Sequence, residues 1–213
     1  GSITLTGVWA GENGDSDTNA SGARLDNVNS PTKSPISITD SSFSFNKYEG
    51  LYARSLGAIT LKDVSASGNQ GGGWGAQLDN AQTGSTAGVT ILNSNGRQNN
   101  FDSNQGNTAG LMVYSYGAIV MNWVTASNNA VHGASIDNRL SATAQNVTLN
   151  YGHFNDNQGG YGLWIDSIGN IAVTLTDCGV NNNSSSGLFL DNSTAATAKT
   201  VTLDGGNYFN NGN

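Results

Sequence analysis

Residues 173–192 read VTLTDCGVNNNSSSGLFLDN, and close variants of this phrase recur along the whole chain. It holds two short segments in which apolar and polar residues alternate, VTL and GLFL, separated by a run of asparagine and serine. Such alternation with β-branched residues is typical of a half-buried strand. The phrase therefore predicts an all-β protein built from short, regularly spaced strands.

The first segment recurs as triplets that begin with a β-branched residue and end with an aliphatic residue or methionine. These triplets span residues 3–5, 36–38, 59–61, 89–91, 119–121, 147–149, 173–175 and 201–203. Their spacing averages about 28 residues, which lies within the range of solenoid repeats. We therefore expect residues 1–213 to form a single solenoid domain of about seven or eight coils.

An asparagine follows each triplet eight residues after its last position. The set comprises Asn13, Asn46, Asn69, Asn99, Asn129, Asn157, Asn183 and Asn211. Asparagines stacked at one turn can hydrogen-bond the main chain and each other, so we expect an asparagine ladder. A second strand opens with glycine after each ladder turn, and a shorter apolar pair lies between the two. Each coil thus offers three inward-facing segments, as a three-sided solenoid requires.

With these three segments per coil, the whole chain resembles the right-handed parallel β-helix proteins of the pectate-lyase-like group. It is most similar to segments of large bacterial surface and adhesin-type proteins, and the resemblance implies the right-handed coil. The string LWIDS (Leu163–Ser167) resembles the W-I-D-H string of pectate lyases, with Ser167 in place of histidine. The Asp-Asp, G-H-G and R-x-K motifs of the related polygalacturonases do not occur in this sequence.

A two-coil period is superimposed on the repeat. The residue closing the second strand alternates between asparagine and serine, in the order Asn27, Ser55, Asn80, Ser115, Asn138, Ser167 and Asn192. Asparagine coils carry loops of eight residues, and serine coils turn in three to five. The repeating unit is therefore a pair of coils of about 54 residues. Neither end has a capping segment, so we expect a piece of a longer solenoid, a truncated chain or copies stacked end to end.

Aspartates precede the closing residue in all four asparagine coils. They favour two interpretations: caps that bond the main chain of the long loops, or a carboxylate row that contacts calcium or sugar. The second interpretation centres on Asp137, Asp166 and Asp191, which the repeat places on successive rungs about 5 Å apart. Calcium is the one cofactor this row suggests. If the protein is an enzyme, these three carboxylates are the candidate catalytic groups.

Aromatic residues lie on the same outward strand face. Tyr52, Tyr114, Trp164 and Phe189 are the candidate ligand-binding residues, as a platform on which sugar rings could stack. The long loops could instead fold over them. We do not expect the arginines beside a carboxylate cluster, and His132 is interpreted as an isolated surface residue. A file of threonines on the first strand suggests ice binding as a further function. Ice binding requires a second matched file of threonines, and the second outward file contains mixed residue types.

Composition narrows the function further. The formal charge is −7 and charged residues make up 11% of the chain, with no cluster of lysine and arginine to neutralise phosphates, so nucleic acid is not an expected partner. No apolar run is long enough to span a membrane. We expect an extracellular or cell-surface segment with a structural or adhesive role, binding glycans or copies of itself. The alternative is a carbohydrate-active enzyme, either a polysaccharide lyase or a glycoside hydrolase.

Overall fold

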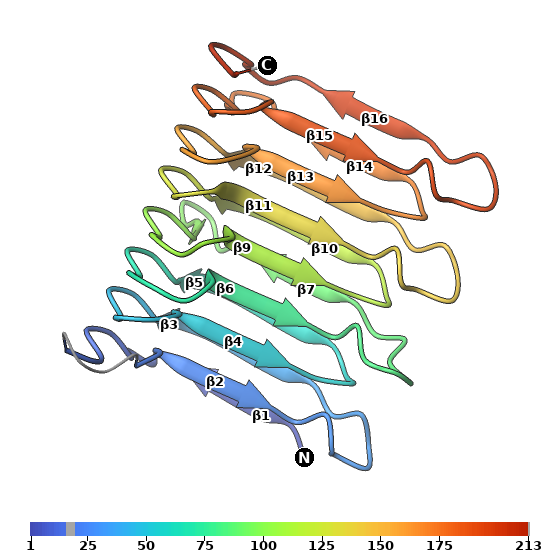
Figure 1. Ribbon diagram of the computed structural model, residues 1–213. Coiled ribbons are helices and arrows are strands. Elements are labelled where there is room, and N and C mark those ends of the chain that lie inside the picture. Colours follow the sequence, from blue (N-terminus) through green and yellow to red (C-terminus); the bar gives the residue numbers. More distant parts are fainter. Residues whose placement is uncertain (16–19, 213) are drawn as a thin grey trace.

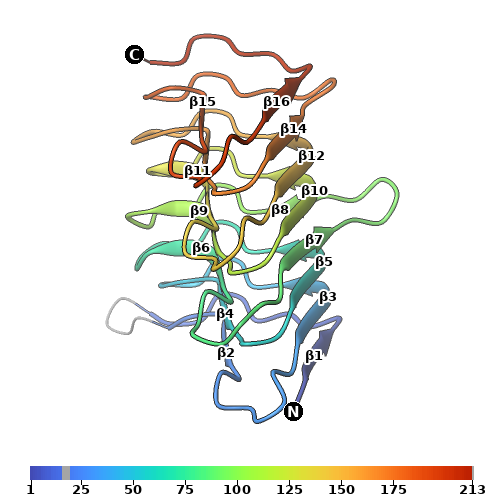
Figure 2. The ribbon, with the colours of Figure 1, turned by 90° about the vertical axis from the view of Figure 1, so that its right-hand side faces the viewer.

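The protein is an all-β stack of parallel strands arranged in two sheets (Figure 1). The computed structural model describes residues 1–15 and 20–212. None of these residues lies in a helix, and the described part of the chain therefore contains no membrane-spanning helix. The two sheets fit a parallel β-helix, in which the chain climbs from the N-terminus at one end to the C-terminus at the other (Figures 1 and 2).

The first sheet holds the strands predicted from the triplets. Its order is β1 (Ile3–Thr6), β3 (Ile36–Ser42), β5 (Ile59–Ser65), β7 (Val89–Leu92), β10 (Ile119–Thr125), β12 (Val147–His153), β14 (Ile171–Thr174) and β16 (Val201–Asp204), with β8 (Asn99–Asn100) beside β5 and β10. The second sheet holds the glycine-led strands. Its order is β2 (Ala23–Asp26), β4 (Leu51–Arg54), β6 (Trp74–Asp79), β9 (Ala109–Tyr114), β11 (His132–Asp137), β13 (Leu163–Asp166) and β15 (Leu188–Asp191).

The predicted third sheet is not separate among the described residues. Four strands of the first sheet, β3, β5, β10 and β12, run for seven residues and continue past a bend. The bends lie at residues with positive φ: Asp40, Asp63, Trp123 and Tyr151. Beyond them the chain stays hydrogen-bonded to its neighbours, for example from Phe101 N to Thr125 O at 2.8 Å. The first sheet thus turns a corner and covers a further side of the core.

The core alternates in size along this further side. Phe43, Phe101 and Phe154 are fully buried, and they alternate in chain order with the buried small residues Ala66 and Ala126. The phenylalanines belong to the coils with tight turns and the alanines to those with eight-residue loops. A large side chain above a small one fills the interior at the density of a packed protein core. The two-coil period of the sequence therefore reaches the core as well as the loops.

Hydrogen bonds join a row of asparagine side chains along the stack. Each Oδ1 accepts the main-chain N–H and the Nδ2 of the asparagine one rung before it, as from Asn157 to Asn183 at 3.1 and 2.8 Å. We call these residues the asparagine row: Asn13, Asn46, Asn69, Asn104, Asn129, Asn157, Asn183 and Asn211. Its members from Asn46 to Asn183 are buried, so the row lies inside the fold.

Asn104 belongs to this row, and the assignment of Asn99 was wrong. The corner after β7 contains an insertion, so Asn104 lies thirteen residues after Ile91, where Asn129 lies eight after Met121. Asn99 is buried at an earlier position of the same coil, at the start of β8, where its Oδ1 accepts the N–H of Val64 at 3.0 Å. A count from the triplet fails wherever the intervening corner is longer.

The strand predicted at residues 173–175 was also wrong in register. Val147 pairs with Ile171 rather than Val173, so β14 begins two residues before the predicted triplet. The turn at residues 168–170 then has three residues, like the turns at 56–58 and 116–118. The two additional residues lie at the corner before Cys178 instead. Leu175 remains buried there, although it is outside the strand.

The alternating Asn/Ser residues close the turns that follow the second sheet. Asn138 Nδ2 donates to Gln145 O at 2.8 Å across an eight-residue loop, and Asn80 makes the same bond to Ala87 O at 2.6 Å. Ser167 Oγ accepts the N–H of Gly169 at 2.9 Å within a tight turn. The longer amide spans the longer loop and the hydroxyl closes the shorter one, which explains the alternation.

Replacing Asn157 by alanine tests the contribution of the asparagine row. The substitution removes both donor bonds of Asn157 and leaves the N–H and Nδ2 of Asn129 without their acceptor. We expect the free energy of unfolding to fall by about 1–3 kcal/mol, the usual cost of unpaired buried polar groups. Chemical denaturation measures it, with Asn95→Ala in an exposed loop as the control. Equal stability of the two variants would contradict a stabilising role.

Candidate functional site

The candidate residues lie on the outward face of the second sheet, in two neighbouring files. One file contains Arg24, Tyr52, Gln77, Met112, Ser135, Trp164 and Phe189. The other contains Asp26, Arg54, Asp79, Tyr114, Asp137, Asp166 and Asp191. Parallel pairing in register places the members of each file on successive strands about 4.8 Å apart. The sheet therefore gathers aromatic and acidic side chains from distant parts of the sequence.

Four of the aspartates bond the main chain of the long loops. Oδ1 of each accepts the N–H of the residue two positions later: Asp26 from Val28 at 3.1 Å, Asp79 from Ala81 at 3.0 Å, Asp137 from Arg139 at 2.8 Å and Asp191 from Ser193 at 2.7 Å. This bond defines an Asx turn, which fixes the start of a loop. Loop capping therefore accounts for one oxygen of each of these carboxylates.

Asp166 differs from the other four. It is 5% exposed, and the guanidinium of Arg139 lies 3.3 Å from its Oδ2 and 2.8 Å from Oδ2 of Asp137. Burial raises the pKa of Asp166; Arg139 opposes this effect, and the charges of Asp137 and Asp191 add to it. Hydrogen bonds from Ser193 instead lower the pKa of Asp191. Adjacent rungs thus hold two carboxyls whose pKa values are shifted in opposite directions.

Arg139 was not expected beside these carboxylates. It follows Asp137 by two residues at the start of a long loop, and its side chain extends to Asp166 one rung away. Arg139 thus places a positive charge between two carboxylates on adjacent rungs that would otherwise repel each other. No group of three or more His, Cys, Asp or Glu side chains within residues 1–15 and 20–212 is arranged to hold a metal ion.

The predicted aromatic platform divides into separate parts. Trp164 and Phe189 lie together, with ring centroids 5.7 Å apart. Tyr52 lies four rungs before Trp164, under the guanidinium of Arg24, whose Cζ is 4.4 Å from the ring centroid. Tyr114 belongs to the aspartate file, opposite Asp137. Of the four predicted residues, only Trp164 and Phe189 therefore have rings in contact, and Tyr114 lies near Trp164 without stacking on it.

Two further aromatic rings complete that surface, and we call His132, Tyr161, Trp164 and Phe189 the aromatic cluster. His132 stacks on Tyr161 with centroids 5.6 Å apart, and Trp164 meets both rings edge-on at 5.3 and 5.4 Å. His132 is not an isolated surface residue, because its Nδ1 accepts the N–H of Tyr161 and burial lowers its pKa. Each of the two added rings directly precedes a glycine that opens a second-sheet strand, which is a signal the sequence contains.

A cavity of about 250 Å³ lies between the aromatic cluster and the charged groups. Its lining includes Tyr114, His132, Asp137, Arg139, Trp164 and Asp166. Ring faces, a guanidinium and carboxylate oxygens thus line one depression on the sheet. This set combines apolar stacking surface with polar groups that fix orientation, as small-molecule sites do.

Comparison with known proteins does not assign the chain to a family. The chain matches no protein-family model, no curated protein and no solved structure.

The opposite pKa shifts predict opposite pH dependences for two substitutions. The folded-state pKa of Asp166 lies above its unfolded value, so its contribution to stability decreases as pH rises through the folded pKa. We expect Asp166→Asn to become more stable relative to the unsubstituted protein as pH rises from about 3 to 7. Thermal unfolding at several pH values measures the difference.

Asp191→Asn is the matched comparison on the next rung. Its folded-state pKa is lowered, so its stabilising contribution is present above the unfolded pKa and is lost as pH falls through the folded pKa. Asp191→Asn should therefore become less stable relative to the unsubstituted protein as pH rises. The same trend for both variants would show that burial does not control Asp166.

Proposed function

We propose that this chain is a segment of an extracellular, right-handed, three-sided β-helix that binds glycans on one side. The parallel sheets, the corners at left-handed residues and the asparagine row support a solenoid of about seven or eight coils grouped in pairs. A solenoid of this kind is stiff and repeats its surface at each rung. Its role in this proposal is structural and adhesive, with binding groups displayed on a rigid support.

The aromatic cluster beside the charged cavity is the observation that carries the proposal. Phe189 is 38% exposed, and an exposed large aromatic side chain next to further rings indicates an interaction surface. Sugar rings present apolar C–H faces to aromatic rings, while their hydroxyls bond to carboxylate and guanidinium groups. Asp137, Arg139 and Asp166 supply those polar groups at the rim of the cluster.

Charge favours neutral glycans over anionic ones. The formal charge of the chain is −7, and the guanidinium in the cavity is already paired with Asp137 and Asp166. An anionic polymer would meet net repulsion along the aspartate file. Hydroxyl-rich neutral sugars avoid this cost and can still accept and donate hydrogen bonds.

Catalysis is the second candidate, and the opposite pKa shifts of Asp166 and Asp191 favour it. A carboxyl with a raised pKa next to one with a lowered pKa is the arrangement used for general acid and base roles. Binding is preferred because Asp137 and Asp191 already cap loops and Asp166 already pairs with Arg139. In the enzyme alternative, Asp137, Asp166 and Asp191 would act on a bound polysaccharide.

Substitution of Trp164 tests the glycan site. We expect Trp164→Ala to weaken binding of a neutral hexasaccharide by about tenfold or more, since one stacked ring contributes roughly 1.5 kcal/mol. Tyr52→Ala is the control, because Tyr52 lies in the same outward file but outside the aromatic cluster. Titration calorimetry with linear hexasaccharides of glucose, mannose and N-acetylglucosamine measures the affinity.

The same panel separates binding from catalysis. Absence of binding by the unsubstituted protein, or equal loss in the two variants, would contradict the glycan site. Release of shorter products that disappears in Asp166→Asn would favour the enzyme.

A further inference from the structure

The corner after β7 carries an insertion that the neighbouring corners do not have. Residues 93–98, which we call the insertion loop, separate Leu92 at the end of β7 from Asn99 at the start of β8. Figure 2 shows the chain projecting sideways here, farther than at the corners above and below. This corner is on the first sheet, away from the aromatic cluster on the second.

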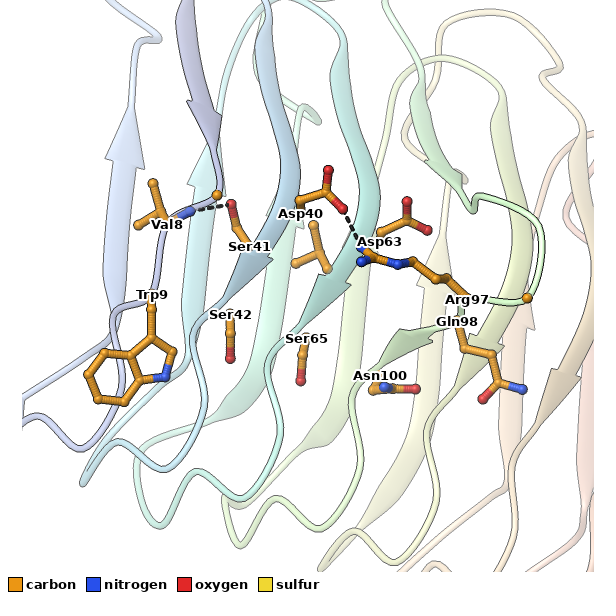
Figure 3. Close-up of a pocket in the computed structure, with 13 residues that line it drawn as sticks. Val8, Trp9, Asp40, Ser41, Ser42, Asp63, Ser65, Arg97, Gln98 and Asn100 are labelled. Atoms are coloured by element: carbon orange, nitrogen blue, oxygen red, sulfur yellow. Dashed lines mark hydrogen bonds and ion pairs between the residues drawn. The ribbon is translucent and has the colours of Figure 1, made fainter.

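The insertion loop is fixed to the two rungs before it. Oδ1 and Oδ2 of Asp63 accept the N–H and Oγ–H of Ser94 at 2.7 and 2.6 Å. Arg97 reaches farther back and forms an ion pair with Asp40, as Figure 3 shows. Asn93 Nδ2 also donates to the carbonyls of Ser94 and Arg97, at 3.0 and 3.2 Å. The loop is therefore held in one position over the corner.

Two aromatic residues occupy the same corner on the following rungs. Trp123 and Tyr151 stack with ring centroids 4.8 Å apart and an interplanar angle of 13°. Their φ angles are 49° and 60°, a conformation that is strained for bulky side chains. On β3 and β5 the equivalent corner residues are Asp40 and Asp63, a residue type that tolerates this conformation better. Two strained, stacked rings at one corner indicate a function other than turning the chain.

A cavity of about 490 Å³ lies between the insertion loop and the first of these rings. Asn93, Asn95, Gly96, Arg97, Gln98 and Trp123 line it. Tyr151 comes from the rung above Trp123 and the loop from the rung below, so the cavity lies on the side of the indole that Tyr151 does not cover. An indole on one side and the amides of the loop on the other form a slot open to solvent.

The chemistry of the slot selects an uncharged, hydroxyl-rich ligand. The Arg97 guanidinium is paired with Asp40, and the amides of Asn95 and Gln98 are exposed in the lining, beside Asn93, whose Nδ2 is bonded within the loop. Amides donate and accept hydrogen bonds equally, as hydroxyl groups require. The indole provides the flat apolar surface against which a sugar ring packs.

We propose that the slot between the insertion loop and Trp123 is a second saccharide-binding site, specific for neutral sugars. It is separate from the aromatic cluster and does not depend on the function proposed for that cluster.

The four tryptophans allow the two sites to be tested separately. Each indole N–H gives one signal in a ¹⁵N–¹H correlation spectrum, and single Trp→Phe variants assign them. The probes are linear hexasaccharides of glucose, mannose and N-acetylglucosamine, with a hexamer of galacturonic acid as the anionic comparison. We expect at least one neutral probe to shift the Trp123 signal in a saturable way, both in the unsubstituted protein and in Trp164→Ala.

Substitutions in the slot give the second readout. Asn95→Ala with Gln98→Ala changes only exposed loop side chains and should weaken binding at Trp123 by about tenfold, leaving the Trp164 signal unaffected. Tyr151→Asp installs the residue type found at the same corner in β3 and β5. Because it removes the ring stacked on Trp123, it should weaken binding at Trp123, while the melting temperature should change by less than about 4 °C.

Failure of this proposal is distinguishable from failure of the first one. A Trp123 signal that no neutral probe shifts, or that shifts only when Trp164 is intact, would overturn the second site. A Trp164 signal that does not shift while Trp123 responds would overturn the glycan site at the aromatic cluster and leave the second site supported. Binding of the anionic hexamer alone at Trp123 would overturn the assignment to neutral sugars.

Discussion

The hydrogen bonds of the asparagine row are the interaction on which the rest of the fold depends. The residue before every member has positive φ, and these residues are Glu12, Phe45, Gly68, Ser103, Asn128, Asp156, Asn182 and Asn210. A left-handed residue costs about 1–2 kcal/mol when it is not glycine. Each central asparagine donates two or three hydrogen bonds worth roughly 1 kcal/mol apiece, so the row offsets the conformational cost of the corners that it follows.

Glycine at the start of the second sheet belongs to the same arrangement. A Cβ at Gly50 would lie 2.5 Å from Nδ2 of Asn69, the member of the asparagine row one rung later, and equally close to two main-chain oxygens. The amide of each rung thus occupies the space left by a glycine of the rung before. The corner, the asparagine and the glycine form one unit, which explains why all three recur together along the chain. Variation is confined to positions outside this unit, where the insertion loop, the eight-residue loops and the aromatic cluster are found.

The sequence was informative wherever a residue type has one structural use. Alternation located the strands of both sheets, and asparagine at a fixed distance located the row in every coil whose corner has the common length. It failed at Asn99 and at Val173 because the corners of those two coils are longer, and a lengthened corner changes the count without changing the residue types. The sequence showed the alternation of Asn27 with Ser55, but only the structure explained it: each residue closes a turn whose length matches its side chain.

The candidate sites were only partly predictable for a different reason. Residues on strands, such as Trp164 and Phe189, could be placed side by side because the register is regular. Arg139 and Arg97 lie in loops, where the position of a guanidinium depends on a path that no repeat encodes. Trp123 and Tyr151 lie at corner positions, and their stacking became evident only once the corner itself was located.

Hydrogen exchange of the main-chain amides tests the role of the asparagine row most directly. In the structure the N–H of Asn69, Asn104 and Asn129 each donates to the side chain of the next asparagine, at 2.9 to 3.0 Å. We expect these amides to be among the slowest to exchange, with Asn104 as protected as Asn69 and Asn129 despite its shifted position in the sequence. Exchange of Asn104 as fast as that of the exposed Asn95 would contradict a continuous asparagine row.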